Sequence, residues 1–347
     1  MKYKLCHILL TMALCLALSD QLSAQDSKLS ALRKDFALRY MQPDAHFALA
    51  KYYIEKGDFV QAFFILEYAR RYRFEKKDFD TEYFKFFGDP MPEPPDEAKD
   101  LFKRASDLAS QQKYDDAEIY FQKAHTRYGK SFFLNAWIGR FYYKAKADAS
   151  KALPFYFNAY FLYPHAYETE FVESRIRAIC GAQADGSYKS SVNNGKSLLE
   201  LARDTNPIIV GMAVQEMAKN WNPEYLSVLI DVMDNDDSIN RWGAFVTLNK
   251  LAGPELDRIV DTLSSGNDLR KRGLAAYAIV ERKGVDKFEL LKKMLADPAE
   301  LVRFDAISAL VLSGGATGKQ ILTKHERVER QPRLKDLIVK SLRSRPE

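Results

Sequence analysis

Few residues in this chain could do chemistry, and they lie far apart in the sequence. After the first 24 residues the only cysteine is Cys180, and the histidines are His46, His125, His165 and His325. No two of these residues have the spacing of zinc ligands, and no nucleophile or dinucleotide-binding motif occurs. A lone cysteine with no histidine near it in the sequence is more typical of a bystander than of a nucleophile. We therefore predict no catalytic residue, no metal and no cofactor.

Two short stretches imitate ligand-binding loops. The segment SGGATGKQ (313–320) resembles a phosphate loop, but its glycine spacing is wrong, and Gln320 stands where a hydroxyl would hold the metal ion. The segment DNDDSIN (234–240) resembles a calcium loop, but Ile239 replaces the glycine that such a loop needs. We interpret the first as a turn between helices and the second as the polar cap of a helix beginning near Ser238.

Three arginines could form a row that binds an anion, because Arg241, Arg272 and Arg303 are spaced 31 residues apart. The same spacing relates small and large apolar residues. These are Ala213, Ala244, Ala275 and Ala306, and then Met217, Leu248, Ile279 and Leu310. A constant period of this length, with apolar residues at helical spacing, is typical of stacked helix pairs. The elements that must position the arginines are therefore repeated helices.

Residues 196–345 resemble HEAT repeats, and ADPAELVRFDAISALVLSGG is close to their lyase-like bacterial subtype. The resemblance implies that an arginine of one repeat lies beside an aspartate at a helix start, so that Arg241, Arg272 and Arg303 form a structural ladder. It carries over no catalytic residue, because the matched positions are those that stack the helices. We favour the ladder, and the anion-binding row is the alternative.

Aromatic residues mark a different first half, since 35 of the 44 lie between Phe36 and Phe171. Segments 57–69, 112–124 and 150–164 share small and large residues at matching positions. These are Ala62, Ala117 and Ala152, then Leu66, Phe121 and Tyr156, and then Ala69, Ala124 and Ala159. Each segment follows another helical one, and the whole resembles tetratricopeptide (TPR) repeats. The third repeat fits the motif best, because the first two lack its tryptophan and glycine.

The first helix of each pair lines the groove in TPR arrays. The resemblance carries this role to Phe47, Lys51, Glu55, Phe102, Ser106, Arg140, Tyr143 and Lys144. These residues mix aromatic rings with charges, as peptide-binding surfaces often do. The alternative for each of them is an ordinary solvated side chain.

We expect an all-α fold, a two-part α-solenoid of TPR-like and then HEAT-like helix pairs. A signal peptide (1–24) precedes a TPR-like domain (25–179) that has an insert near 75–98. A linker rich in glycine, serine and asparagine (180–195) leads to the HEAT-repeat domain (196–347). The insert joins an aromatic piece to a proline-rich acidic one. It is either a loop whose aromatic rings pack on the neighbouring repeat or a binding arm.

The N-terminus has the form of a secretory signal peptide. Lys2 and Lys4 precede the apolar run Leu5–Leu18, and Ala24 offers a small residue for cleavage. The alternative is a membrane anchor, although this run is short for a spanning helix and no second one follows. Without residues 1–24 the chain keeps 50 of its 52 basic and 46 of its 47 acidic residues, a net charge of +4. So small a charge does not indicate nucleic acid or an anionic membrane as a partner.

These expectations predict an exported, non-catalytic scaffold or adaptor that binds a protein partner through solenoid grooves. Its location would be the periplasm, or outside the cell, of a Gram-negative bacterium. The alternative is an enzyme, or an accessory subunit of an envelope enzyme complex, with an unrecognised site. Melting with a panel of metabolites and metals separates the two, because a scaffold should ignore such ligands.

Overall fold

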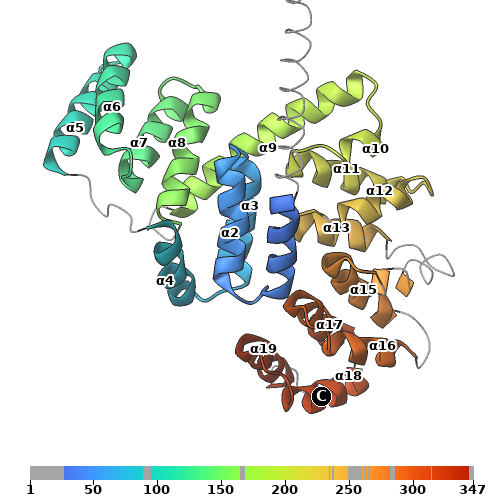
Figure 1. The fold of residues 1–347 in the computed structure, drawn as a ribbon. Helices are drawn as coiled ribbons and strands as arrows, with labels where there is room; N and C mark the ends of the chain where they lie inside the picture. The colour runs from blue at the N-terminus through green and yellow to red at the C-terminus, as the bar shows by residue number, and fades with distance from the viewer. Residues whose placement is uncertain are drawn as a thin grey trace, which may run out of the picture. The chain divides into compact units, whose positions relative to one another are not determined.

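The computed structural model describes residues 27–88, 95–164, 169–233, 235–236, 238–248, 260–261, 263–264, 266–281, 286–313 and 315–343. The described residues form helices and no strands, which confirms the all-α class (Figure 1). Within the same residues, no helix combines the length and the apolar character that a membrane crossing needs. The predicted signal peptide (1–24) lies outside the described residues.

The described residues form two compact units. One unit runs from Gly57 to Leu248, and the other combines the residues up to Lys56 with those from 260 onward. This division differs from the predicted boundaries at 179 and 196, because the helices before Gly57 belong with the last repeats. The two-part solenoid remains a prediction.

The unit from Gly57 to Leu248 consists of successive helices that pack on one another. They are α3 (Phe59–Tyr72), α4 (Lys76–Phe87), α5 (Asp96–Ser110), α6 (Tyr114–Tyr128), α7 (Phe132–Lys144), α8 (Ala149–Leu162), α9 (Thr169–Asn193), α10 (Leu198–Leu201), α11 (Pro207–Lys219), α12 (Tyr225–Val232) and α13 (Ser238–Leu248). Helix α5 pairs with α6 and α7 with α8, while α9 packs on both α8 and α11. Several helices begin at side chains that accept a backbone N–H: Asp58 from Gln61, Ser131 from Leu134 and Asp148 from Lys151.

The small and large residues matched between the three aromatic segments all lie in the core. The nine residues are Ala62, Ala117, Ala152, Leu66, Phe121, Tyr156, Ala69, Ala124 and Ala159. Helices that pack closely need a small residue opposite a large one, and Gly139 shows how close the approach is. A methyl group added to Gly139 of α7 would lie 2.8 Å from two ring carbons of Tyr156 in α8. Helices α7 and α8 therefore approach at a distance that only glycine allows at this point.

The segment predicted as a linker (180–195) is helical as far as Asn193, which corrects that prediction. It continues α9, a helix of 25 residues that contains Gly181 and Gly186. Glycine disfavours a helix by about 1 kcal/mol relative to alanine. The buried stripe of α9 offsets this cost, since it packs against α8 and α11. The stripe consists of Val172, Ile176, Ile179, Cys180 and Ala184.

Most of the described part of the insert near 75–98 is helix α4, and its aromatic rings pack inward. Phe79 and Tyr83 are fully buried. The Tyr83 hydroxyl donates a hydrogen bond to the carbonyl of Phe161 in α8 at 2.5 Å. These contacts support the packing interpretation of the aromatic piece. Residues 89–94, which include most of its proline-rich part, lie outside the described residues.

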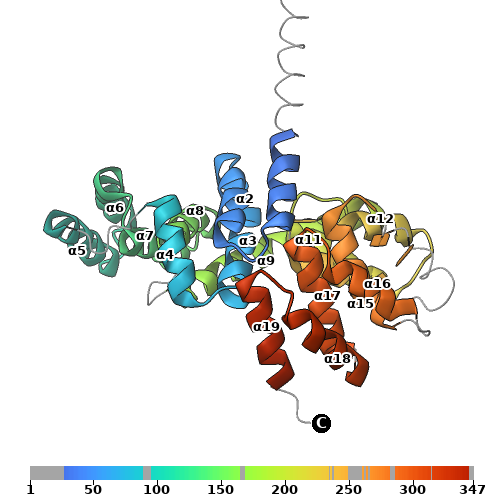
Figure 2. The ribbon, with the colours of Figure 1, turned by 60° about the horizontal axis from the view of Figure 1, so that its bottom comes forward.

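The other unit begins with helical residues 27–38 and continues with α2 (Pro43–Glu55). Its remaining labelled helices are α15 (Leu269–Glu281), α16 (Asp286–Leu295), α17 (Glu300–Ser313), α18 (Gly315–Glu326) and α19 (Pro332–Arg343). Helices α17, α18 and α19 lie side by side in both views (Figure 1, Figure 2). The repeat positions Ala275, Ala306, Ile279 and Leu310 are buried here, and Ala213, Ala244, Met217 and Leu248 are buried in the first unit.

The arginines spaced by 31 residues make the same backbone contact. Each donates from Nη1 to the carbonyl six residues earlier: Arg241 to Asn235 at 3.1 Å, Arg272 to Gly266 at 2.9 Å and Arg303 to Asp297 at 2.8 Å. Two of them also bind an acidic residue that precedes the first helix of the following helix pair. Arg272 binds the carboxylate of Asp297 through Nε and Nη2 at 2.9 and 3.1 Å.

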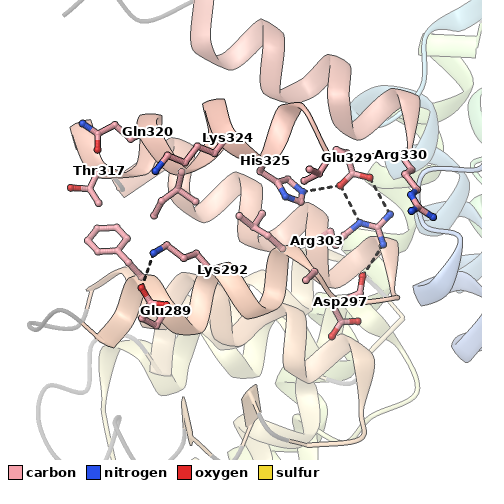
Figure 3. Close-up of a pocket in the computed structure, with 15 residues that line it drawn as sticks. Glu289, Lys292, Asp297, Arg303, Thr317, Gln320, Lys324, His325, Glu329 and Arg330 are labelled. Carbon is pink, nitrogen blue, oxygen red and sulfur yellow. Dashed lines mark hydrogen bonds and ion pairs between the residues drawn. The ribbon is translucent and has the colours of Figure 1, made fainter.

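Arg303 binds Glu329 in the same way, at 3.1 and 3.4 Å (Figure 3). The partner of Arg303 is thus a glutamate, where the resemblance implies an aspartate. Asp297 and Glu329 in turn accept the N–H groups of Ala299 and Gln331 at 2.8 and 2.9 Å. Each guanidinium therefore ties the start of one repeat to the start of the next, which is the structural ladder.

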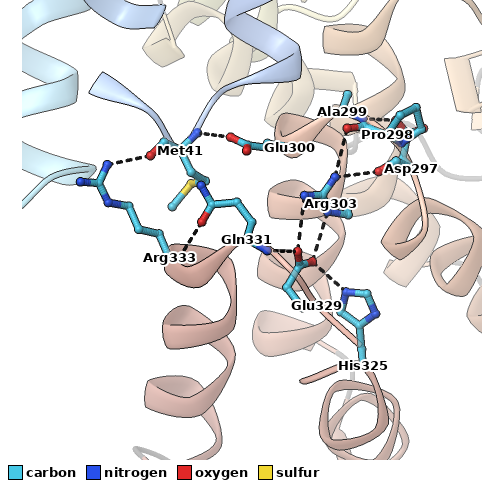
Figure 4. Close-up of polar contacts among 10 residues, drawn as sticks. All are labelled: Met41, Asp297, Pro298, Ala299, Glu300, Arg303, His325, Glu329, Gln331 and Arg333. Atoms are coloured by element: carbon cyan, nitrogen blue, oxygen red, sulfur yellow. Dashed lines mark hydrogen bonds and ion pairs between the residues drawn. The ribbon is translucent and has the colours of Figure 1, made fainter. Parts of the chain in front are cut away.

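The segment before α2 is held against the last repeats by polar and ring contacts (Figure 4). The N–H of Met41 donates to the carboxylate of Glu300 at 2.8 Å, and Arg333 donates to the Met41 carbonyl at 2.7 Å. The rings of Tyr40 and Phe304 lie 5.4 Å apart. These contacts join residues more than 250 positions apart in the sequence, and they explain why both ends of the described chain share one unit.

Candidate functional site

The eight predicted groove residues divide between the two units. Phe47, on α2, is fully buried, so it is not available to a partner and the prediction is wrong for this residue. Lys51 and Glu55 are exposed on the same helix. Glu55 forms a solvent-exposed pair with Lys28 at 3.4 Å. The remaining five residues lie in the unit from Gly57 to Leu248.

Helices α5 and α7 meet through two stacked aromatic rings. The ring centres of Phe102 in α5 and Trp137 in α7 lie 3.9 Å apart, with an angle of 25° between the ring planes. Both residues are half-buried, as is Ser106 one turn further along α5. Part of the predicted role of Phe102 is therefore structural, because its ring joins two neighbouring helix pairs.

Arg140, Tyr143 and Lys144 lie on α7. Residues of α8 and α9 lie near them in the structure. The guanidinium of Arg175, from α9, lies 5.2 Å from the ring centre of Tyr143 and 5.1 Å from that of Phe171. The ammonium nitrogen of Lys144 lies 6.0 Å from the centre of the Tyr143 ring. Rings within about 6 Å of a cation attract it through their quadrupole. Two aromatic rings therefore lie beside Arg175, and no described acidic residue pairs with it.

A buried hydroxyl completes this group. Tyr156 of α8 is fully buried, and its oxygen has no hydrogen-bond partner among the described residues. Burial raises the pKa of Tyr156 to about 12, although the charges of Arg175 and Arg140 act in the opposite direction. Both arginines therefore lie within electrostatic reach of the hydroxyl. We call Arg140, Tyr143, Tyr156, Phe171 and Arg175 the α7–α9 cluster.

The arginines of the α7–α9 cluster differ from those of the ladder in lacking a carboxylate. Neither Arg140 nor Arg175 forms an ion pair within the described part of the chain, and the Nε of Arg175 is buried without an acceptor. Buried donors are normally satisfied, because an unsatisfied one costs about 1–3 kcal/mol. The cluster therefore offers guanidinium donors and the partly exposed rings of Tyr143 and Phe171 to an incoming acidic group.

Four residues beside the predicted positions were missed: Trp137, Tyr156, Phe171 and Arg175. A signal for two of them was present in the sequence. Ala117 and Ala152 are 35 residues apart, and the same step leads from Phe102 to Trp137 and from Arg140 to Arg175. The repeat period therefore placed Arg175 on the next helix at the position equivalent to Arg140. Nothing in the sequence indicated that Tyr156 would be buried without a partner.

In a second charged cluster of this unit, both acidic groups are paired with arginines. Glu67 of α3 and Glu173 of α9 are buried, and three arginines surround them. Arg70 and Arg71 bind Glu173, while Arg177 binds Glu67 through Nε at 3.1 Å. Arg71 also reaches Glu67 at 2.9 Å. This network joins α3 to α9, and its acidic groups are occupied by the protein itself.

The described residues considered for chemistry each have partners of their own or are buried. Cys180 is buried in α9, and burial raises the pKa of its thiol to about 12, so the reactive thiolate is scarce at neutral pH. His325 contacts Glu329 at 3.0 Å, and His46 lies 3.3 Å from the carbonyl of Gln42. His165 lies outside the described residues. The described side chains of His, Cys, Asp and Glu form no group of three that could hold a metal ion.

None of the family models, curated proteins or solved structures compared with this chain matches it. The resemblance to TPR and HEAT repeats therefore rests on the residue positions given above.

Proposed function

We propose that this protein is an exported, non-catalytic scaffold that binds a protein partner, and that the α7–α9 cluster is part of the binding surface. The observation that carries this proposal is the pair Arg140 and Arg175, two guanidinium groups without an ion pair in the described residues, of which Arg175 lies beside two aromatic rings. Arginine and aromatic residues dominate the energy of protein interfaces. A partner with an acidic group would satisfy donors that the chain leaves open.

The arrangement of the helices supports the same role. Successive helix pairs bury their core between neighbours and leave one helix of each pair facing outward, which is how helical repeat proteins present binding surfaces. The signal-peptide pattern of residues 1–24 supports a location in the periplasm or outside the cell. The Gram-negative envelope is the setting that we propose, and the partner is a protein of that envelope.

Site-specific crosslinking in the native host tests the proposal. A photoreactive amino acid in place of Tyr143 should capture one recurrent envelope protein, identified by mass spectrometry. The same amino acid in place of Tyr120, a half-buried residue of α6, serves as the matched control. Capture at position 143 should disappear in the Arg175→Gln variant. Triple replacement of Arg140, Tyr143 and Lys144 should also abolish binding of the captured protein while leaving the fold intact.

Two outcomes contradict the proposal. Equal capture at positions 143 and 120 would show that the α7–α9 cluster is not the binding surface. Capture that survives both Arg175→Gln and the triple replacement would show that the arginines do not recognise the partner.

A further inference from the structure

A second candidate site lies in the other unit, between the last two complete helix pairs. It is a pocket of about 820 Å³ whose walls are α16 and α18 (Figure 3). It shares no residue with the α7–α9 cluster and is independent of the function proposed for that cluster. Pockets of this volume are typical of binding sites.

The pocket forms a groove along two helices. Its lining residues on these helices run from Phe288 to Leu295 on α16 and from Thr317 to His325 on α18. Seven residues of helix correspond to about 10 Å at 1.5 Å per residue. That length matches about three residues of extended polypeptide, at about 3.3 Å each. The shape therefore favours a short extended segment.

The acidic groups of the pocket are already bound by the protein. Glu329 accepts from Arg303 and contacts His325, and Asp297 accepts from Arg272. Burial opposes the charge of Glu329, but the hydrogen bonds from His325 and the Gln331 N–H and the charge of Arg303 outweigh it and hold its pKa at about 2. This part of the wall is a neutralised network that needs no ligand.

The basic groups of the pocket are not matched in the same way. Lys324 and Arg330 are exposed, and within the described part of the chain neither has an ion-pair partner. Among the described residues, Lys292 pairs with Glu289 of the same helix, at 2.6 Å. Lys292 and Lys324 line opposite walls of the pocket (Figure 3). The Lys324 ammonium has no carboxylate beside it in the described residues, so it would attract an incoming carboxylate.

Apolar side chains lie beside these cations. Leu295 and Ile321 are buried at the pocket wall and Phe288 is half-buried. Val328 also lines the pocket, and 67% of its surface is exposed, the largest fraction among the exposed large hydrophobic residues. Burial of apolar surface contributes about 25 cal/mol per Å². The pocket thus offers an apolar surface next to excess positive charge.

We propose that this pocket binds a short, extended acidic peptide segment of a partner protein. A carboxylate of the segment binds Lys324, and a neighbouring aliphatic side chain contacts Phe288, Ile321 and Val328. A second carboxylate reaches Arg330 at the other end of the groove.

Fluorescence polarisation with the full mature chain tests this proposal. The probe is a fluorescein-labelled hexapeptide in which glutamate and leucine alternate. We expect it to bind at low ionic strength and to weaken as salt is added. Two comparison peptides replace the glutamates by lysine or the leucines by glycine, and both should bind at least about tenfold more weakly.

The decisive variant is Lys324→Glu, which should weaken binding of the glutamate–leucine peptide by about tenfold, equivalent to about 1.4 kcal/mol. Its matched control is Lys335→Glu, an exposed lysine of α19 outside the pocket, which should leave the affinity unchanged. Both residues are exposed, so both variants should fold.

Several results would overturn the proposal. One is no binding of the peptide at about 1 mM. Another is equal loss of affinity in Lys324→Glu and Lys335→Glu, which would indicate a non-specific charge effect. A third is competition by succinate as strong as that by the unlabelled peptide, which would assign the pocket to small dicarboxylic acids. Because the α7–α9 cluster is tested by different variants, each proposal can fail while the other stands.

Discussion

The arginines of the ladder and those of the α7–α9 cluster occupy opposite chemical situations. Arg272 and Arg303 each bind a backbone carbonyl and a carboxylate, so their donors are used within the protein. Arg140 and Arg175 form no ion pair in the described residues, and Arg175 lies beside the rings of Tyr143 and Phe171. The difference teaches that the partners of an arginine, and not its spacing in the sequence, distinguish a structural arginine from one available to a partner.

The largest effect should come from breaking the buried network of α3 and α9. In Glu173→Gln, the guanidinium groups of Arg70 and Arg71 lose a charged partner in a buried setting. Loss of one member of a buried ion pair costs about 3–5 kcal/mol. Urea denaturation followed by circular dichroism should show a decrease of this size in the free energy of unfolding. Glu170→Gln, at an exposed position on the same helix, is the control and should change it by less than about 0.5 kcal/mol.

Acid should weaken the last rung of the ladder. The pKa of Glu329 is lowered from its ordinary value of 4.5 to about 2 in the folded protein. Because the folded pKa is the lower one, the ionised carboxylate stabilises the fold above pH 4.5, and this contribution is lost as the pH falls toward 2. A shift of this size corresponds to about 3 kcal/mol. The pH dependence of unfolding in the wild type and in Glu329→Gln measures it, and identical profiles would contradict it.

Removal of one ladder arginine should have a moderate effect on stability and none on binding. Arg272→Gln loses the paired contact with Asp297 and the bond to the Gly266 carbonyl. Hydrogen bonds to charged groups contribute about 1.5–3 kcal/mol, so we expect a loss of about 2 kcal/mol and a melting temperature lower by a few degrees. Arg327→Gln, at an exposed residue of the same unit, is the control. An unchanged melting temperature with lost binding of an anion would favour the anion-binding row.

The smallest effect on stability should follow replacement of Arg140 or Arg175. Neither forms an ion pair in the described residues, so Arg140→Gln and Arg175→Gln should change the free energy of unfolding by less than about 0.5 kcal/mol. The thermal melts of both variants test this expectation beside the crosslinking described above. A loss as large as that of Arg272→Gln would show that the α7–α9 cluster is structural, and the distinction between the two sets of arginines would then fail.

Much of the fold could be predicted because the repeats are periodic. The helical class and the buried repeat positions, such as Ala117 and Ala306, follow from spacings that local sequence reveals. The linker prediction was wrong because composition was weighed above pattern. Val172, Ile176 and Ile179 form a helical stripe before the predicted linker, and Cys180 and Ala184 continue it into the segment that looked irregular for its glycines and serines.

The candidate sites were less accessible to sequence reasoning. Arg140 and Tyr143 were predicted from their place on the first helix of a repeat, and Arg175 could have been added from the 35-residue step. The position of Phe47 on α2 was predicted correctly as helical, but its side chain is buried and its groove role was wrong. Which face of a helix is covered depends on the neighbouring helices, and one turn of sequence carries no record of them.

The sequence by itself determined the helical class, the repeat spacings and the positions of the ladder arginines, because these follow from residue types at regular intervals along the chain. Only the tertiary structure decided which arginines have a carboxylate, that the segment around Met41 joins the last repeats, and that Lys292 and Lys324 line one pocket. The physical reason is that an ion pair or a pocket wall requires two side chains within a few ångströms. For residues more than 250 positions apart, such as Met41 and Glu300, that distance is set by tertiary packing and not by local sequence.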